Sequence, residues 1–127
     1  MLVKKVLIIE DDVLIANYIK YVLEKNEYYV TGIADTTETV KKSIKVLCPD
    51  IALLDIRLSG GESGIDISGV LDKKDIPFVY LTANSDRSTM SSALKTNPVA
   101  YITKPFNEDN VIAAIELLRQ GREEEQV

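Results

Sequence analysis

Short runs of consecutive apolar residues recur along the chain, and each of them stops at a polar side chain. Four runs are made mostly of β-branched, aliphatic and aromatic residues, at positions 6–9, 51–54, 77–81 and 99–102. Because these runs do not alternate with polar residues, they predict strands buried on both faces, as in a parallel sheet. A fifth run at 28–34 is less apolar. We therefore predict that this run forms a strand at the sheet edge.

The segments between the first runs carry apolar residues at helical spacing. They predict a helix over residues 13–25, a second helix whose start is marked by a capping box of Asp35 and Glu38, and a third interrupted by Gly64 and Gly69. The residues expected on the buried faces are Ile15, Tyr18, Ile19, Val22 and Leu23, then Val40, Ile44 and Leu47, then Ile67, Val70 and Leu71.

Two further helices are predicted in the C-terminal part. A fourth helix at about 86–95 is rich in Ser and Thr, which are poor helix formers, so we expect it to be the least rigid. The last helix begins after Asn107 as N-cap and ends at Gly121. The apolar residues of these two helices are Met90, Ala93 and Leu94, then Val111, Ile112, Ile115 and Leu118.

Five strands alternating with five helices predict one α/β domain in which helices cover both faces of a parallel sheet. We find no repeat or linker, so the domain is expected to occupy residues 1–127, with a core at about 4–120 and a polar tail at 121–127. A chain of 127 residues has the length of one domain.

Composition excludes several classes of function. The chain has no histidine, which excludes Ser-His or Cys-His catalysis and a His-ligated zinc site. A formal net charge of −5 and the lack of a basic stretch argue against direct binding of nucleic acid. No apolar run is long enough to span a bilayer and the N-terminus does not resemble a signal peptide, so a cytoplasmic location is expected. The single cysteine, Cys48, is predicted to be a small buried hydrophobe.

Residues with chemistry follow the ends of the apolar runs. Glu10 and Asp11 follow the first, Asp55 the second, Thr82 the third and Lys104 the fourth. The carboxyl ends of parallel strands meet at one edge of the sheet, where ligands of open α/β sheets bind. We therefore expect these five side chains to converge.

Such a cluster indicates phosphoryl chemistry. Clustered carboxylates repel one another unless a cation neutralises them, and oxygen ligands select a hard ion such as Mg²⁺ or Mn²⁺. A lysine can hold a phosphate, a threonine hydroxyl can donate to a phosphoryl oxygen, and an aspartate can act as nucleophile. A plainer alternative is that Glu10, Asp11 and Asp12 are solvated acids at a helix start. That alternative does not cover Asp55, which ends an apolar strand with no helix start directly after it.

The motifs together resemble the receiver domain of response regulators in two-component signal transduction. They are Ile-Ile-Glu-Asp-Asp at 8–12, Leu-Leu-Asp-Ile at 53–56, Leu-Thr-Ala at 81–83 and Tyr-Ile-Thr-Lys-Pro-Phe at 101–106. The resemblance covers about residues 4 to 120. It implies a flavodoxin-like, doubly wound (βα)5 fold with a five-stranded parallel sheet in the order 2-1-3-4-5.

The resemblance also implies a role for each matching residue. Asp55 would be the phosphoacceptor, with Glu10 and Asp11 as the acidic pair and Asp11 as direct metal ligand. The backbone carbonyl of Arg57 would be a further ligand, and Lys104 would bind the phosphate before a cis bond to Pro105. Thr82 and Tyr101 would form a switch pair, although Tyr101 is equally consistent with a core position.

Implied partners are a sensor histidine kinase or phosphotransfer protein, and an output domain or protein bound through the fourth helix, fifth strand and last helix. A homodimer on activation is also implied. The domain would be a signalling switch that promotes its own phosphorylation and dephosphorylation rather than an enzyme. Because the chain lacks histidine, a phosphohistidine donor must be another chain.

One loop departs from the family pattern, and two other functions compete. The segment 57–64 is longer than the common Met-Pro-x-x-x-Gly form and lacks its proline, while Arg57 and Asn84 occupy positions that tune the phosphoryl lifetime in this family. The alternatives are a degenerate receiver that only binds protein, and a small phosphatase with an aspartyl nucleophile. Such phosphatases usually have a second Asp where this chain has Arg57.

Overall fold

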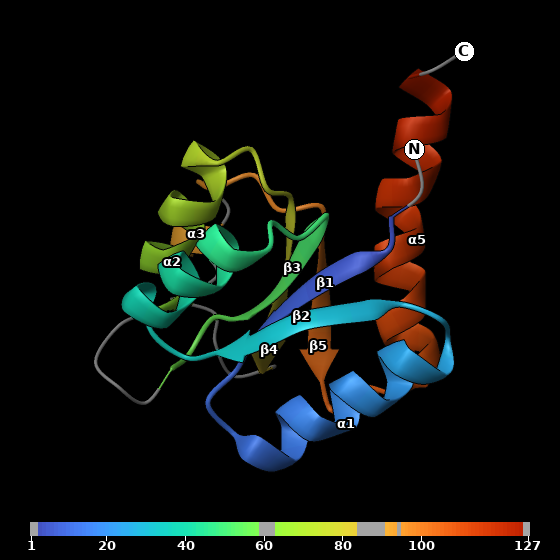
Figure 1. The fold of residues 1–127 in the computed structure, drawn as a ribbon, viewed down its shortest axis with the longest axis horizontal. Helices are drawn as coiled ribbons and strands as arrows, with labels where there is room; N and C mark the ends of the chain where they lie inside the picture. Colours follow the sequence, from blue (N-terminus) through green and yellow to red (C-terminus); the bar gives the residue numbers. More distant parts are fainter. Residues whose placement is uncertain (1–2, 59–62, 84–90, 94, 126–127) are drawn as a thin grey trace.

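The computed structural model describes residues 3–58, 63–83, 91–93 and 95–125, with side chains up to 118. Strands and helices alternate along it from residue 5 to residue 83 (Figure 1). In order they are β1 Lys5–Ile9, α1 Val13–Lys25, β2 Tyr29–Ala34, α2 Thr37–Val46, β3 Ile51–Asp55, α3 Gly64–Lys73, β4 Phe78–Ala83, β5 Ala100–Lys104 and α5 Glu108–Glu125. The predicted fourth helix lies mostly outside the described residues, although 91–93 are helical.

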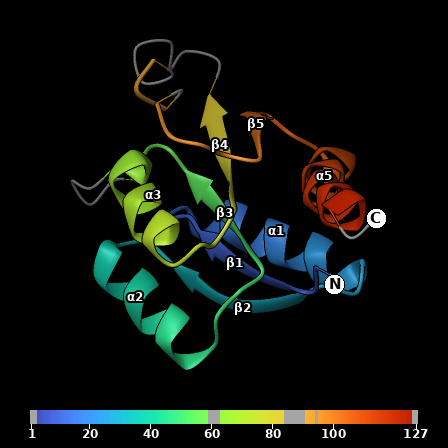
Figure 2. The same cartoon turned by 90° about the horizontal axis from the view of Figure 1, so that it is seen from above.

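The strands form one parallel sheet in the order β2-β1-β3-β4-β5. Helices α1 and α5 cover one face, and α2 and α3 cover the other (Figure 2). The predicted doubly wound fold and strand order are therefore confirmed. The order changes direction between β1 and β3, which places the ligand-binding crevice beyond the carboxyl ends of these two strands.

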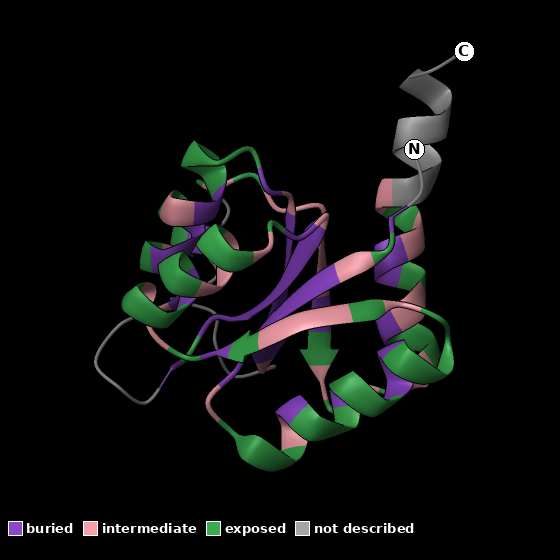
Figure 3. Ribbon diagram, viewed as in Figure 1, coloured by how far each residue is buried: buried purple, intermediate pink, exposed green. Residues whose placement is uncertain are grey.

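The core has two halves, one on each face of the sheet. Alternate residues of β1 contribute to opposite halves: Val6 and Ile8 pack with α1 and α5, while Leu7 and Ile9 pack with α2 and α3. Every residue of β3 is buried, as its continuous apolar run predicts, whereas β2 is only partly covered (Figure 3). The edge position predicted for residues 28–34 is thus confirmed.

Several local predictions were wrong. Helix α2 is capped by Thr36, whose hydroxyl accepts from the backbone N–H of Thr39 in a capping box, rather than by Asp35 with Glu38. Tyr18 in α1 is exposed, and Ala16 takes a place on the buried face. Cys48 is also exposed rather than buried.

Helix α5 begins as predicted but ends later. Asn107 caps it, because its Oδ1 accepts from the backbone N–H of Asn110 at 2.9 Å while the Asn110 side chain accepts from the N–H of Asn107. The helix runs through Gly121 to Glu125, so the prediction that Gly121 ends it was wrong. One glycine costs a helix only about 1 kcal/mol.

Candidate functional site

The three predicted carboxylates come together at the carboxyl ends of β1 and β3. The register pairs Ile9 with Leu54, so Glu10 and Asp55 lie side by side just beyond this pair. Oxygens of Glu10, Asp11 and Asp55 all lie within 4.8 Å of one another. Glu10 and Asp55 are buried, while Asp11 is partly exposed. The cluster lines an open cleft of about 360 Å³ that also reaches Arg57 and Lys104.

Lys104 joins the cluster from the end of β5. Its Nζ donates to Asp55 Oδ2 at 2.7 Å and to Glu10 Oε1 at 3.3 Å. Burial lowers the pKa of Lys104, but hydrogen bonds and attraction from Asp55 and then Glu10 outweigh this and raise it. The lysine is therefore held charged. The following bond to Pro105 is cis, as predicted.

Glu10 is the most perturbed acid of the site. Burial raises its pKa to about 8, helped by the neighbouring Asp55 and opposed by Lys104. Its side chain has no exposed surface, and Oε2 has no hydrogen-bond partner among the described residues. A buried oxygen without a partner is costly. Because the unsatisfied atom sits beside two other carboxylates, the donor set fits a hard divalent cation.

This raised pKa predicts a pH-dependent stability. Folding raises the pKa of Glu10 from 4.5 to about 8, so between these values the folded state holds a proton that the unfolded state has released. We expect the free energy of unfolding of the metal-free protein to fall as the pH rises through this window. Urea unfolding of wild type and Glu10→Gln across the window measures the effect. The decline should be clearly shallower in the variant; equal slopes would contradict the assignment.

Thr82 and Tyr101 lie on the neighbouring strands β4 and β5. In the register between β3 and β4, Leu81 pairs with Asp55. Thr82 is the next residue of β4, and its side chain is buried. Tyr101 pairs with Tyr80, and the two rings stack with centroids 5.8 Å apart. Burial raises the pKa of Tyr101.

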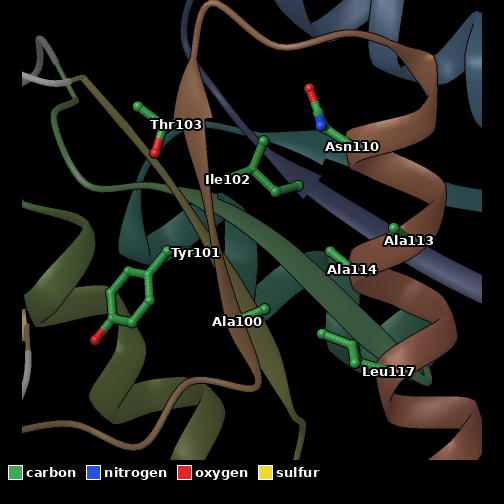
Figure 4. A pocket seen from close by; sticks show the side chains of 8 residues that line it. All are labelled: Ala100, Tyr101, Ile102, Thr103, Asn110, Ala113, Ala114 and Leu117. Atoms are coloured by element: carbon green, nitrogen blue, oxygen red, sulfur yellow. The ribbon is translucent and has the colours of Figure 1, made fainter.

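Side chains of β5 alternate between two sides of the strand. Ala100 and Ile102 point toward α5, whereas Tyr101 and Thr103 point away from it (Figure 4). The pocket between β5 and α5 has a volume of about 490 Å³. Tyr101 is half-buried and packs against the α2–α3 half of the core, so it lies at the margin of the core on a strand that also lines a surface pocket.

Backbone contacts hold the described residues on either side of positions 59–62 near the end of β3. The backbone N–H of Arg57 donates to Asp55 Oδ1 at 2.9 Å, and Arg57 pairs with Ser63 in an isolated bridge. Residues 59–62 and Asn84 lie outside the described part of the chain. The N–H of Gly64 donates to the carbonyl of Ile56 at 2.8 Å.

Gly64 lies against the backbone at the end of β3, and the sequence did not reveal this close approach. A Cβ on Gly64 would lie 2.1 Å from the backbone oxygen of Asp55 and 2.8 Å from Cα of Ile56. Since both obstacles are backbone, Gly64→Ala must displace the backbone at Gly64 or at the end of β3, and we expect it to lower the free energy of unfolding by about 1–3 kcal/mol.

Gly69, in the same helix, supplies the matched control for Gly64→Ala. A Cβ on Gly69 would meet nothing within 4 Å. Gly69→Ala should therefore raise the free energy of unfolding by roughly 0.5–1 kcal/mol. Urea unfolding measures both variants, and equal effects of the same sign would contradict the close-approach argument.

Asp12 also lines the cleft but has a structural explanation. Its Oδ1 accepts from the backbone N–H groups of Leu14 at 3.0 Å and Ile15 at 3.3 Å, which makes it the N-cap of α1. The plainer interpretation of the acidic run therefore holds for Asp12. It does not extend to Glu10, which is buried before the helix begins.

A doubly wound parallel sheet with an acidic cleft and a lysine at its carboxyl edge defines a class of protein. Comparison with known sequences identifies that class. The profile of the response regulator receiver domain matches residues 6–116, and the chain belongs to this family. It is accordingly a receiver domain of two-component systems, a signalling domain rather than a typical enzyme. Members of the family typically bind Mg²⁺.

Curated relatives are longer than this chain. Transcriptional regulatory protein KdpE of Staphylococcus aureus is 34% identical over 116 residues, which cover 91% of this chain and 50% of KdpE. Phosphate regulon transcriptional regulatory protein PhoB of Escherichia coli is 34% identical over 116 residues, covering 88% of this chain and 50% of PhoB. The chain spans about half the length of these relatives.

Solved structures share the whole fold. The receiver domain of a modulated diguanylate cyclase from Desulfovibrio desulfuricans has a TM-score of 0.86 and 33% identity, covering 95% of this chain and 97% of that one. The N-terminal domain of a response regulator/sensory box/GGDEF protein from Carboxydothermus hydrogenoformans has a TM-score of 0.83 and 29% identity, covering 95% and 98%. Within the described residues, no helix has the length and apolar character that crossing a membrane requires.

Proposed function

We propose that this domain is a phosphorylation-dependent switch in which Asp55 accepts a phosphoryl group with the help of Mg²⁺ or Mn²⁺. The observation that carries the proposal is the contact of Lys104 Nζ with Asp55 Oδ2 at 2.7 Å, inside a cleft that also holds Glu10 and Asp11. A lysine beside three clustered acids at the end of a parallel sheet suits the transfer of a phosphoryl group.

In the proposed reaction, a carboxylate oxygen of Asp55 attacks the phosphorus of a phosphohistidine. The new O–P bond forms as the N–P bond breaks, and the imidazole leaves with the electron pair. The ammonium group of Lys104 would then move from the Asp55 carboxylate to contact the phosphoryl oxygens. Asp11, Asp55 and the backbone carbonyl of Arg57, with Glu10 assisting, would hold the metal, which neutralises charge on the transferring group. The same residues would promote later hydrolysis of the aspartyl phosphate.

Thr82 and Tyr101 are proposed to transmit the change. The Thr82 hydroxyl, one residue beyond the partner of Asp55 in β4, would donate to a phosphoryl oxygen. Its movement would free space next to β5, and Tyr101 would rotate to fill it because packed interiors switch between discrete arrangements. The surface formed by residues 91–93, β5 and α5 would then bind an output domain or partner protein, or a second copy on activation.

The phosphoryl donor is proposed to be a sensor histidine kinase or a phosphotransfer protein in the cytoplasm. Apolar side chains at the rim of the cleft support a protein donor. A groove of about 510 Å³ beside Lys104 is lined by Leu14, Tyr18 and Phe106 among others. Leu14 is 81% exposed, and an exposed apolar patch of this kind is typical of a surface that contacts another protein. We assign this domain no direct contact with nucleic acid.

Intact-protein mass spectrometry after incubation with acetyl phosphate and Mg²⁺ tests the proposal against its alternatives. We expect an adduct of one phosphoryl group that lasts for minutes. No adduct would favour a degenerate receiver that only binds protein. Rapid turnover of phosphate esters without an adduct would favour a phosphatase.

The proposed metal site predicts that Mg²⁺ stabilises the folded protein. A ligand that binds only the folded state adds about 2.7 kcal/mol when its free concentration is a hundredfold above Kd. Thermal unfolding with and without Mg²⁺ measures the shift, with Asp11→Asn as the variant that should lose most of it. An unchanged melting temperature in wild type, or an equal shift in Asp11→Asn, would contradict the metal site.

A further inference from the structure

The outer surfaces of α2 and α3 form a groove with a basic rim and an apolar floor. The two helices lie side by side on the sheet face opposite α1 and α5 (Figures 1 and 2). The groove has a volume of about 540 Å³ and is lined by Lys41, Ile44, Lys45, Val70, Lys73 and Lys74. Residues of α2 at i, i+3 and i+4 line one side of the groove, and residues of α3 at i and i+3 with the C-cap Lys74 line the other.

The four lysines have no carboxylate partner among the described residues, although lysines elsewhere do. Lys42, also on α2, binds Glu38 at 3.1 Å, and Lys25 binds Glu108 at 3.2 Å. Lys41 and Lys45, by contrast, stand one helical turn apart with like charges, an arrangement that weakens a helix. The four lysines of this groove therefore carry positive charge that no ion pair of the described residues holds in place.

The floor of the groove is apolar. Ile44 and Val70 are half-buried and pack against the α2–α3 half of the core, so each leaves part of an aliphatic side chain open between the lysines. An inorganic anion would use the lysines but not this floor, whereas a purely apolar group would leave the ammonium groups uncompensated. The combination suits a segment that carries carboxylates on both sides of an apolar side chain.

We propose that this groove binds an acidic amphipathic segment of a partner protein. Charge complementarity favours a peptide over larger anions. Duplex nucleic acid and an anionic membrane each cover a wide surface, and the chain as a whole carries a net charge of −5 that repels them. A peptide segment needs only the narrow basic strip between two helices. The binding does not depend on phosphorylation of Asp55, which lies at the end of the sheet.

The test uses a fluorescein-labelled peptide of three Glu-Glu-Leu-Leu repeats, and a second peptide with Gln in place of Glu. We expect the acidic peptide to raise the fluorescence anisotropy on titration with the protein, with an affinity that weakens as salt rises. Amide NMR should place the largest shift changes in α2 and α3. The double variant Lys41→Glu/Lys73→Glu should bind at least about tenfold more weakly. Lys20→Glu on α1 is the matched control and should bind as wild type does.

Four results would overturn the proposal. They are equal affinity for the Gln peptide, unchanged binding by the double variant, shift changes outside α2 and α3, and tighter binding to anionic vesicles or a DNA duplex than to the acidic peptide. Because Lys41 and Lys73 are exposed, the double variant should keep the wild-type melting temperature and accept phosphate from acetyl phosphate at the wild-type rate. Failure of the peptide test is thereby distinguishable from failure of the proposed phosphoryl transfer.

Discussion

Asp55→Asn should abolish uptake of a phosphoryl group from acetyl phosphate while leaving the fold intact. The amide keeps the shape of the side chain but cannot act as a nucleophile. The substitution also relieves repulsion among three acids whose oxygens lie within 4.8 Å of one another, while Lys104 keeps its contact with Glu10 at 3.3 Å, so the metal-free variant should stay close to wild type in stability. Intact-protein mass spectrometry and urea unfolding measure the two effects.

Asp12→Asn is the matched control for this experiment. Asp12 lines the same cleft but caps α1, and asparagine is an equally good N-cap. We expect it to accept phosphate and to unfold as wild type does. Labelling of Asp55→Asn at the wild-type rate would place the acceptor elsewhere.

Lys104→Ala should cause the largest loss of stability in the metal-free protein. Lys104 is the cation that contacts both buried acids, and the side chains of Asp55 and Glu10 are only 7% and 0% exposed. Removing one partner of a buried ion pair leaves an uncompensated charge, which costs about 3–5 kcal/mol. Urea unfolding at neutral pH with a chelator gives the value. Part of the loss should return on addition of Mg²⁺, because the metal replaces the missing positive charge.

Two comparisons isolate the cause of this loss. Lys25→Ala breaks an exposed ion pair with Glu108 and should change stability little. Adding Asp55→Asn to Lys104→Ala should recover much of the lost stability, because the double variant no longer buries an unpaired carboxylate at position 55. Strictly additive effects of the two substitutions would show that the stability of the site does not depend on this charge pair.

The meeting of acids and lysine could be predicted because it follows from long-range regularities, whereas the strand order was implied by the resemblance to the receiver family. Continuous apolar runs such as β3 place Asp55 at the end of a buried strand, and parallel strands bring their ends together. The residue that caps a helix depends on smaller differences in free energy between neighbouring candidates. Asp35 and Thr36 are both good caps, and Thr36 prevails in a structure where its reciprocal bond with Thr39 forms and Val40 is buried.

Other features depend on neighbours that the sequence does not bring together. The stacking of Tyr101 on Tyr80 is set by the β4–β5 register. The exposure of Cys48 and the close approach of backbone atoms to Gly64 likewise depend on the paths of the segments that connect strands and helices. Apolar character alone could not predict them.

Amide NMR of the protein with Mg²⁺ and beryllofluoride, which mimics the phosphoryl group on Asp55, tests the proposed switch most directly. Our account predicts shift changes next to Asp11, Asp55 and Lys104 that continue through Thr82 to Tyr101 and residues 91–93. Asp55→Asn should show none of them. Shift changes confined to the loops around the cleft, with Tyr101 and residues 91–93 unaffected, would contradict the coupling of the acceptor to the output surface.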